Sequence, residues 1–460
     1  MMQAFRNILS IPDLRRRVFY TFGLLGVYRI GGHIPTPGID SQALMELFQR
    51  NQGSILGFVD MFSGGNFSKL TIFALGIMPY ITASIILQLL TVIWPYLEKL
   101  SKEGEAGRKK ITQYTRYGTV ALSLVQSFGI SIWLETGAGS GVVTSPGWGF
   151  RLMTMLTLTT GTAFIMWLGE QISERGIGNG ISLIIYAGIV VGLPGAIVNT
   201  IQDLKTGALS AFTVLLLLIL MVGVVAAIVF VERAQRKIPI QYARRVVGRR
   251  VYGGAATFLP LRVNTAGVIP VIFASSMLAI PQTLGGIDKL KEWGWLQAIL
   301  RQLDYSAMFY NVAYAAMIIF FCFFYVSIIF NPVDQADNMK KYGGFIPGIR
   351  PGKRTAEYID RILTRLTFGG ALYLAAISLL PMILINGLRV QTLPFIGPSL
   401  EGFFPTWITQ GLGIKFFFGG TSLLIVVGVA MDTVQQIESQ LIMRHYDGFL
   451  KGTRLRGRRG

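Results

Sequence analysis

Few residues in this sequence have the types and spacing that catalysis requires. The two histidines, His33 and His445, lie far apart, and the single cysteine, Cys322, lies in an apolar run. Neither a metal cluster nor an intramolecular disulfide is therefore expected. No Ser–His–Asp set, carboxylate pair or HExxH motif is placed for catalysis. We expect no enzymatic activity, no cofactor and no bound metal.

Two glycine-rich motifs resemble ligand-binding loops but differ from them in spacing or context. The motif GIRPGKRT, residues 348–355, is one residue shorter than a phosphate-binding loop, and arginine follows its lysine where serine or threonine is needed. The motif ERGIGNGIS, residues 174–182, joins two apolar runs, whereas a dinucleotide-binding loop joins a strand to a helix. The first is not expected to bind phosphate, and the second favours a tight turn with close helix packing.

The chemistry that the chain does offer is that of aliphatic side chains inside a membrane. Hydrophobic residues make up 52% of the chain and charged residues only 14%, which is typical of a polytopic membrane protein. Ile77 and Ile81 are four residues apart and share a helix face, as do Ile181 and Ile185. Such side chains can form a constriction that stops ions by dewetting. Alternatively, these isoleucines simply face lipid or neighbouring helices.

Charged residues are almost absent from the apolar runs. Arg29 is the one charge deep within a run, and we expect it to pair with a neighbour or a backbone carbonyl. A role for it beyond helix packing is left open. Transporters that couple to ions usually need ionisable residues at mid-membrane, so the bare spans argue against that class.

The residues that would form a constriction belong to the stretch 61–94. It has no charged residue from Leu70 to Trp94, which is long enough to cross a bilayer core of roughly 30 Å. Gly76 and Pro79 interrupt this run, so a kinked helix is expected. The apolar piece before it, residues 57–67, is too short to span and contains a Gly-Gly break. This combination predicts a re-entrant element in front of a pore-lining helix.

The apolar runs predict ten membrane spans, of which the fifth is interrupted by glycine and proline. Of the 42 lysines and arginines, 32 fall on one side, which the positive-inside rule identifies as the cytoplasm. Both termini are then cytoplasmic. Five spans in each half are compatible with an inverted repeat. The expected spans are residues 18–34, 70–94, 114–135, 152–171, 177–198, 208–231, 265–284, 309–330, 366–386 and 416–435.

Two cytoplasmic segments are too long and too basic to be simple connectors. In residues 231–264, alternation at 238–243 and a turn at Gly253-Gly254 predict a protruding hairpin. In the second segment, residues 331–363, Gly343-Gly344 and Pro347-Gly348 predict a loop around Arg350. The charges either enforce topology and touch anionic lipid headgroups, or dock an acidic partner such as ribosomal RNA or a motor protein. The basic residues concerned are Arg244, Arg245, Arg249, Arg250, Arg350, Lys353 and Arg354.

Motifs in order along nearly the whole chain resemble those of the SecY family, the channel subunits of the bacterial protein-conducting Sec translocon. The resemblance implies an all-α polytopic protein with ten transmembrane helices. These would form two pseudo-symmetric five-helix halves around an hourglass pore: residues 1–207 and 208–436, with a basic tail at 437–460. An external loop at 387–415 is longer than the family leads us to expect. The motifs include MFSGG, ALGIMPYI, MWLGEQI, ERGIGNGIS, VNTAGVIPVIFASS, PGIRPG and FGGTSLLIVV.

The resemblance also implies roles for individual residues. The plug would span about residues 55–69, the gate would open sideways to lipid between the second and seventh helices, and the cytoplasmic loops 232–263 and 331–365 would dock the driver. The implied pore ring is Ile77, Ile81, Ile181, Ile185, Ile272 and Ile425. The implied plug residues are Phe58, Met61, Phe62, Ser63, Gly64 and Gly65, and the gate residues are Ile86, Gln88, Ser275 and Ser276.

As a member of this family, the chain is expected to conduct unfolded secretory polypeptides passively and to release transmembrane segments into lipid. The implied location is the bacterial cytoplasmic membrane. The implied partners are the small subunits SecE and SecG, the SecA motor, the ribosome, preproteins with their signal peptides, anionic lipids, YidC and SecDF. A small-solute transporter or an intramembrane enzyme are the rival classes. Each would need polar groups within the spans that this sequence lacks.

Overall fold

In the computed structural model, two compact units contain the described residues. Unit 1 comprises residues 1–199, 279–300 and 429–460, and unit 2 comprises 200–278 and 301–428. The structure describes residues 11–50, 60, 63–136, 141–207, 210–242, 245–247, 250–252, 256–284, 302, 307–387 and 420–452. The predicted plug residues Phe58, Met61 and Phe62, and nearly all of the external loop at 387–415, lie outside this part.

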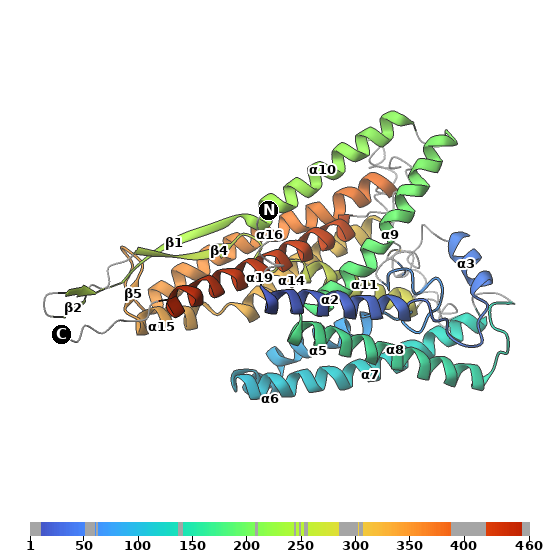
Figure 1. Ribbon diagram of the computed structural model, residues 1–460, viewed down its shortest axis with the longest axis horizontal. Coiled ribbons are helices and arrows are strands. Elements are labelled where there is room, and N and C mark those ends of the chain that lie inside the picture. Colours follow the sequence, from blue (N-terminus) through green and yellow to red (C-terminus); the bar gives the residue numbers. More distant parts are fainter. Residues whose placement is uncertain are drawn as a thin grey trace. The chain divides into compact units, whose positions relative to one another are not determined.

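Unit 1 is built from helices. They are α2 (Pro12–Gly31), α3 (Ser41–Arg50), α5 (Met78–Ile93), α6 (Pro95–Lys102), α7 (Glu105–Thr136), α8 (Trp148–Arg175) and most of α9 (Gly180–Lys205), together with the later part of α19 (Gly420–Gly452). Helix α7 packs against α8 and α5, and α2 packs against α8 (Figure 1). Pro194 lies inside α9 without ending it, as transmembrane helices tolerate.

A stripe of small hydroxyl residues allows the close packing of α7. The side chains recur every fourth residue and are buried, and their hydroxyls donate to carbonyls of the preceding turn. Small side chains let helix backbones approach each other, which favours packing inside a bilayer. The stripe is formed by Thr115, Thr119, Ser123, Ser127 and Ser131.

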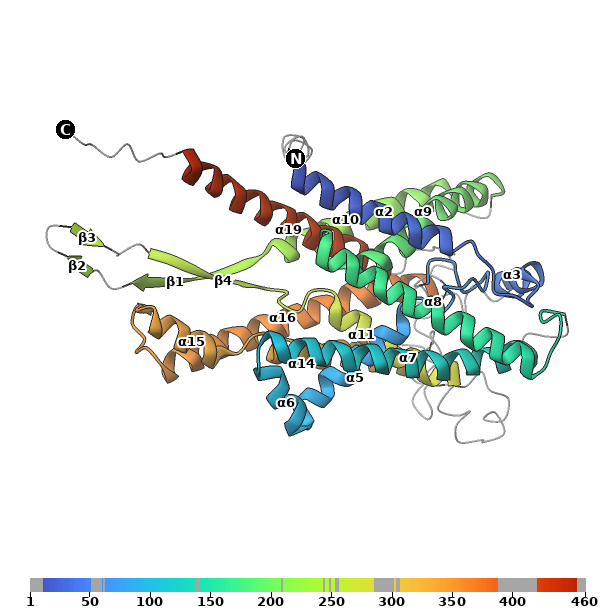
Figure 2. The same ribbon diagram turned by 60° about the horizontal axis from the view of Figure 1, so that its bottom comes forward.

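Unit 2 combines helices with a small sheet. Its helices are α10 (Ala211–Arg233), most of α11 (Ile269–Leu284), α14 (Met308–Ile329), α15 (Pro332–Lys341), α16 (Lys353–Asn386) and the start of α19. Its strands are β1 (Gln235–Tyr242), β2 (Arg245–Val247), β3 (Arg250–Tyr252), β4 (Ala256–Arg262) and β5 (Gly344–Phe345). Figure 2 shows α14 and α16 side by side. A side-chain cap begins both α10, at Ser210, and α15, at Asn331.

Each of the ten predicted spans contains a helix in the described residues. Six of these helices are long and apolar enough to cross a membrane, or seven if the bent pair α5–α6 counts as one span. They are α7, α8, α9, α10, α14 with α15, and α16. The chain is therefore a multi-pass, mainly helical membrane protein.

The second span differs in detail from its prediction. A continuous kinked helix over residues 70–94 is wrong, because the helix begins only at Met78 and residues 72–77 form turns. Leu70 and Gly76 both have a left-handed backbone, with φ of 38° and 56°, and Pro79 lies in the first turn of the helix. These conformations cannot continue a helix upstream of Met78. The helix also turns by 99° at its other end, where α6 begins.

The predicted hairpin is present as two antiparallel strand pairs. Strand β1 pairs with β4, and β2 pairs with β3 (Figure 2). Gly253-Gly254, where the turn was predicted, lie outside the described residues.

Candidate functional site

The described part of the predicted plug is hydrogen-bonded to helix α2. The hydroxyl of Tyr28 donates to the carbonyl of Ser63 at 3.2 Å, and Nη1 of Arg29 donates to the carbonyl of Gly64 at 3.4 Å. The amide of Asn66 donates in turn to the Tyr28 hydroxyl at 3.2 Å. The expectation that Arg29 pairs with a backbone carbonyl is confirmed. These bonds tie the MFSGG motif to the first span.

Glycine brings the plug into contact with helix α9. A Cβ atom added at Gly64 would lie 2.7 Å from the Cα atom of Gly188, and Gly64 has φ of 74°. Only glycine combines this backbone conformation with such a close approach. Gly188 follows Ile185, one of the two predicted ring residues of α9, by one helical turn. The plug therefore packs on the helix that carries part of the predicted constriction.

Asp60, which no sequence motif indicated, organises the plug turn. The backbone amide of Ser68 donates to Oδ1 of Asp60 at 2.7 Å. The Asp60 carbonyl accepts from the hydroxyl of Ser63 and from the amide of Gly65, both at 2.9 Å. An aspartate shortly before a Gly-Gly pair is a common signal of such a turn and could have been used.

The predicted ring residues are buried in their respective units. In unit 1, Ile77 precedes the first turn of α5, and its carbonyl accepts from the amide of Ile81 at 3.1 Å, so the two side chains lie one turn apart. Both are 5% exposed. Burial argues against lipid-facing positions. Of the other predicted ring residues, Ile185 is buried and Ile181 half-buried in unit 1, and Ile272 and Ile425 are buried in unit 2. That all six side chains converge in one ring stays a prediction.

The predicted gate residues differ in exposure. On α5, Ile86 is 43% exposed, and Gln88 is half-buried with no hydrogen-bond partner for its Oε1 atom among the described residues. On α11, Ser275 and Ser276 are buried, and both hydroxyls donate to the carbonyl of Ile272, at 2.9 and 2.8 Å. Both serine hydroxyls thus find an acceptor within α11.

The two basic segments form a single module in unit 2. Strand β5 of the second segment pairs with β1 of the first, so that Gln241 lies opposite Phe345, and the sheet order is β4-β1-β5. A shared core joins this sheet to α15 and α16. The core residues are Ile238, Ile240, Leu261, Met339, Ile346 and Ile359. The predicted loop is present at residues 346–352 around Arg350, whereas Lys353 and Arg354 already belong to α16. Helix α15 and the two-residue strand β5 were not predicted.

Three of the predicted docking residues are exposed at the surface of this module. Arg350, Lys353 and Arg354 are exposed at the start of α16. The threonine of GIRPGKRT, Thr355, is buried, and its hydroxyl donates to the Arg350 carbonyl at 2.9 Å. The motif therefore forms the turn that precedes α16. Arg245 and Arg250 lie in strands β2 and β3. Arg244 and Arg249 lie outside the described residues.

The motif ERGIGNGIS forms the expected turn between α8 and α9. A Cβ atom at Gly180 would lie 1.9 Å from the carbonyl oxygen of Gly169, so the two helices meet backbone to backbone. Gly178 has φ of 90°, and its amide donates to Oε1 of Gln436 on α19 at 3.1 Å. The interpretation as a tight turn with close helix packing is confirmed.

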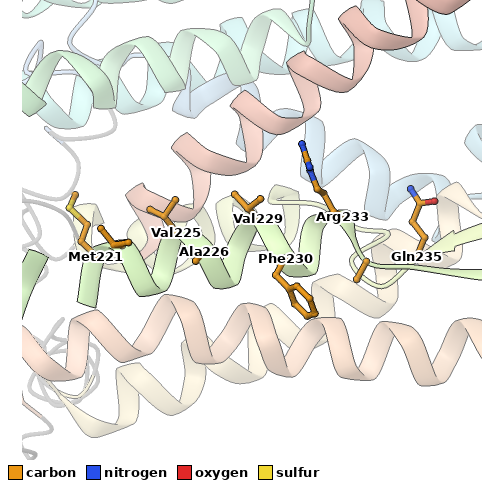
Figure 3. A pocket seen from close by; sticks show the side chains of 9 residues that line it. Met221, Val225, Ala226, Val229, Phe230, Arg233 and Gln235 are labelled. Atoms are coloured by element: carbon orange, nitrogen blue, oxygen red, sulfur yellow. The ribbon is translucent and has the colours of Figure 1, made fainter. Parts of the chain in front are cut away.

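An open groove of about 910 Å³ runs along helix α10 (Figure 3). Its lining is aliphatic and aromatic, with a single charged side chain, Arg233, at the end of the helix. Such a lining provides no nucleophile, base or metal ligand. It suits contact with lipid or with another helix. The lining residues are Met221, Val222, Val225, Ala226, Val229, Phe230, Arg233, Ala234 and Gln235.

Comparison with known proteins identifies the family. The family model described as SecY matches residues 71–434. The chain is 48% identical over 454 residues to the protein translocase subunit SecY of Escherichia coli strain K12, covering 97% of this chain and 96% of the relative. It is 47% identical over 460 residues to the Vibrio cholerae subunit of the same name, covering 99% and 98% of the two chains.

Solved structures share the fold at low sequence identity. A protein-conducting channel is 19% identical, with a TM-score of 0.63 and coverage of 93% of both chains. Sec61 from a canine ribosome–channel complex is 18% identical, with a TM-score of 0.58 and the same coverage of both chains. Together with the full-length relatives, these likenesses show that the chain belongs to the SecY family.

Proposed function

We propose that this protein is the central channel subunit of a Sec translocon. It conducts unfolded secretory polypeptides across the membrane and releases sufficiently apolar segments sideways into lipid. Aliphatic side chains at the constriction form no hydrogen bonds that require a particular substrate, so they can deform around any sequence. A segment that leaves for lipid gains about 0.8 kcal/mol per CH₂ group removed from water.

The observation that carries this proposal is the contact between the plug and α9. Gly64 of the MFSGG motif lies against Gly188, one turn beyond Ile185. A solute transporter needs a binding pocket with polar groups at this depth, whereas here a backbone turn fills the space beside aliphatic residues. This arrangement is suited to a seal that can be displaced, which a protein-conducting channel requires.

The proposed membrane arrangement follows from the charge distribution. Both termini lie in the cytoplasm of a bacterium, the channel resides in its cytoplasmic membrane, and the basic module projects into the cytoplasm. The halves are residues 1–207 and 208–436, followed by the tail at 437–460. Helix α5 with Ile86 and Gln88, and helix α11 with Ser275 and Ser276, form the two sides of the lateral gate.

The chain acts with partners because it contains no nucleotide site that could drive transport. Two structures with the same fold, canine Sec61 and yeast Ssh1, were solved with ribosomes. The exposed cations of the basic module suit docking of ribosomal RNA or of the acidic surface of SecA. SecE and SecG complete the channel, preproteins and their signal peptides pass through it, and anionic lipids, YidC and SecDF contact it.

Crosslinking of a stalled secretory chain tests the proposal. Single cysteines replace Ile77, Ile272 or Ile425 in a Cys322→Ser background, with lipid-facing controls at Phe212 and Val222, which are 73% and 62% exposed. We expect crosslinks at all three isoleucine positions and none at the controls. If an engaged chain forms no crosslinks at the isoleucines, the path lies elsewhere and the transporter alternative returns.

A further inference from the structure

The chain enters the basic module after α10 and leaves it after β4, and we call this place the neck. A buried side-chain hydrogen bond joins its two strands of chain. Nδ2 of Asn264 donates to Oε1 of Glu232 at 2.6 Å, and the two residues are only 4% and 6% exposed. The same amide nitrogen donates to the carbonyl of Gly267 at 3.2 Å. A short hydrogen bond between two buried side chains is directional, so this contact fixes both of them in one geometry.

The bond lies where the chain enters and leaves the module. Glu232 is in the last turn of α10, three residues before β1, and Asn264 comes two residues after β4. Between them, the backbone amide of Val263 donates to the carbonyl of Ala234 at 3.0 Å, which extends the β1–β4 pairing toward the membrane. The neck is therefore closed by one backbone bond and one side-chain bond.

The helix beyond the neck is α11. It begins at Ile269, two residues after the Gly267 carbonyl that Asn264 holds, and carries Ile272, Ser275 and Ser276. Gly267 has φ of 63°, so the entry into α11 is a defined turn. A displacement of Asn264 is thus passed to the first turn of α11 through one short, hydrogen-bonded segment.

Helix α16 supports the neck from another side. A Cβ atom at Gly370 would lie 2.7 Å from the carbonyl oxygen of Val263, so α16 and the neck touch through backbone. The first turn of α16 bears Lys353 and Arg354, so the helix that carries the second basic segment's cations also touches the neck of the first.

A buried carboxylate is a costly way to hold three segments together. Desolvating such a group costs several kcal/mol, and apolar packing gives equal or greater stability. Polar pairs of this kind can instead specify one arrangement of the parts that they join. We infer that the Glu232–Asn264 pair is a positioning joint, which transmits docking at the basic module to the gate residues on α11. This inference rests on the proposed function.

The test measures the gate and the docking separately. Ile86→Cys and Ser276→Cys are introduced in a Cys322→Ser background of the full channel complex in proteoliposomes, and the rate of disulfide formation is measured with and without SecA. In the parent protein, SecA is expected to change this rate. Asn264→Ala, which removes both side-chain bonds, is expected to reduce the change at least fivefold while the affinity for SecA stays the same.

Two further variants separate positioning from folding. Glu232→Gln keeps an oxygen that accepts from Asn264, so it is expected to retain the response. Asn311→Ala removes a buried asparagine amide that donates to the Ala307 carbonyl at 3.1 Å in α14, away from the neck, and is also expected to retain it. If Asn264→Ala does not fold, Asn264→Leu keeps a side chain of similar size but offers neither a donor nor an acceptor.

The outcomes are distinguishable. A full SecA response in the folded Asn264 variant overturns the joint and leaves the proposed function intact. A parallel loss of SecA affinity, or an equal loss in Asn311→Ala, assigns the pair a purely structural role and also overturns the joint. If SecA does not change the disulfide rate in the parent protein, this result contradicts the proposed driver-gated channel and therefore also the joint.

Discussion

Gly64 and Gly65 have the same left-handed backbone but different surroundings. Their φ angles are 74° and 77°. A Cβ atom at Gly64 would lie 2.7 Å from Gly188, whereas one at Gly65 would meet nothing within 4 Å. Replacing either glycine by alanine costs roughly 1–2 kcal/mol of backbone strain. Only the replacement at Gly64 also forces the plug away from α9.

Alanine substitutions at these two positions therefore distinguish the effect of backbone strain from the effect of losing the plug–α9 contact. We expect Gly64→Ala to raise the resting ion conductance of the channel in planar bilayers, because the plug no longer seats on α9. Gly65→Ala is the matched control and is expected to leave the conductance near the wild-type level. Equal conductance in the two variants would show that the Gly64–Gly188 contact does not maintain the seal.

Two ion pairs close the α7–α8 hairpin, one near each end. Arg116 of α7 pairs with Glu170 of α8 at 2.8 Å, and Glu135 of α7 pairs with Arg151 of α8 at 2.5 Å. The two positions on each helix are 19 residues apart, or ~28 Å at 1.5 Å per residue. This separation is close to the thickness of the hydrocarbon core, roughly 30 Å. The pairs therefore fix the register of the hairpin at both faces.

The two ion pairs are expected to differ in their contribution to stability. Glu135 is 5% exposed and also accepts from the amide of Gly147 at 2.9 Å, while Arg116 of the other pair is 46% exposed. We expect Glu135→Gln to lower the free energy of unfolding by about 3 kcal/mol, because it leaves Arg151 without its charge partner. Glu170→Gln should cost at most about 1 kcal/mol.

Thermal unfolding in detergent, followed by light scattering or intrinsic fluorescence, compares the two variants. The isosteric change at Glu170 serves as the control for altered net charge. A larger loss of stability in Glu170→Gln than in Glu135→Gln would mean that burial does not determine which ion pair contributes more to the free energy of unfolding.

Individual elements show what could and could not be predicted from sequence. Long apolar runs predicted α7, α8, α10 and α14. A membrane span needs about 20 apolar residues, and few other structural elements contain so long an apolar run. The start of α5 was misplaced because apolar composition does not distinguish a helix from turns. Strand β5 was missed because two residues carry no periodicity, and its pairing with β1 is a long-range contact.

The functional site also contains residues that could be predicted from the sequence and residues that could not. The Arg29–carbonyl contact was predicted, because a charge in an apolar run must find a partner. Asp60 and Glu232 were overlooked, since their importance depends on burial and on distant partners such as Ser68 and Asn264. Membership of the family indicated the plug and ring positions, which no spacing rule alone would have supplied.

For the whole channel, the isoleucines are expected to form the barrier to ions. Replacing Ile77, Ile81, Ile181 and Ile185 together by serine should make resting membranes leak, because a polar constriction stays wetted. Single-channel recording in planar bilayers measures the conductance. A matched set of serine substitutions at lipid-facing positions of α10 provides the control. An unchanged conductance in the isoleucine variant would contradict a hydrophobic seal.

Docking of the driver is expected to depend on the exposed charges of the basic module. Arg350→Glu should weaken SecA binding by about tenfold, which corresponds to ~1.4 kcal/mol, and reduce its dependence on salt. Equilibrium binding to proteoliposomes at two ionic strengths measures both effects. Lys341→Glu, an exposed change of equal charge on α15, is the control. Equal weakening by both variants would indicate a general field effect and no specific contact at Arg350.

The covalent attachment of the plug to α5 has a kinetic consequence. A stopper that is part of the chain closes its seat in a first-order step, at an effective concentration in the millimolar range for a short tether. The bond from Tyr28 contributes about 0.5–1.5 kcal/mol net and the bond from the charged Arg29 about 1.5–3 kcal/mol, so an entering polypeptide can displace them. In the proposed channel, the rate of reclosure after each passage is therefore expected to be independent of channel abundance. We expect the membrane potential to be maintained by the proximity of the tethered plug to its seat, and not by tight binding.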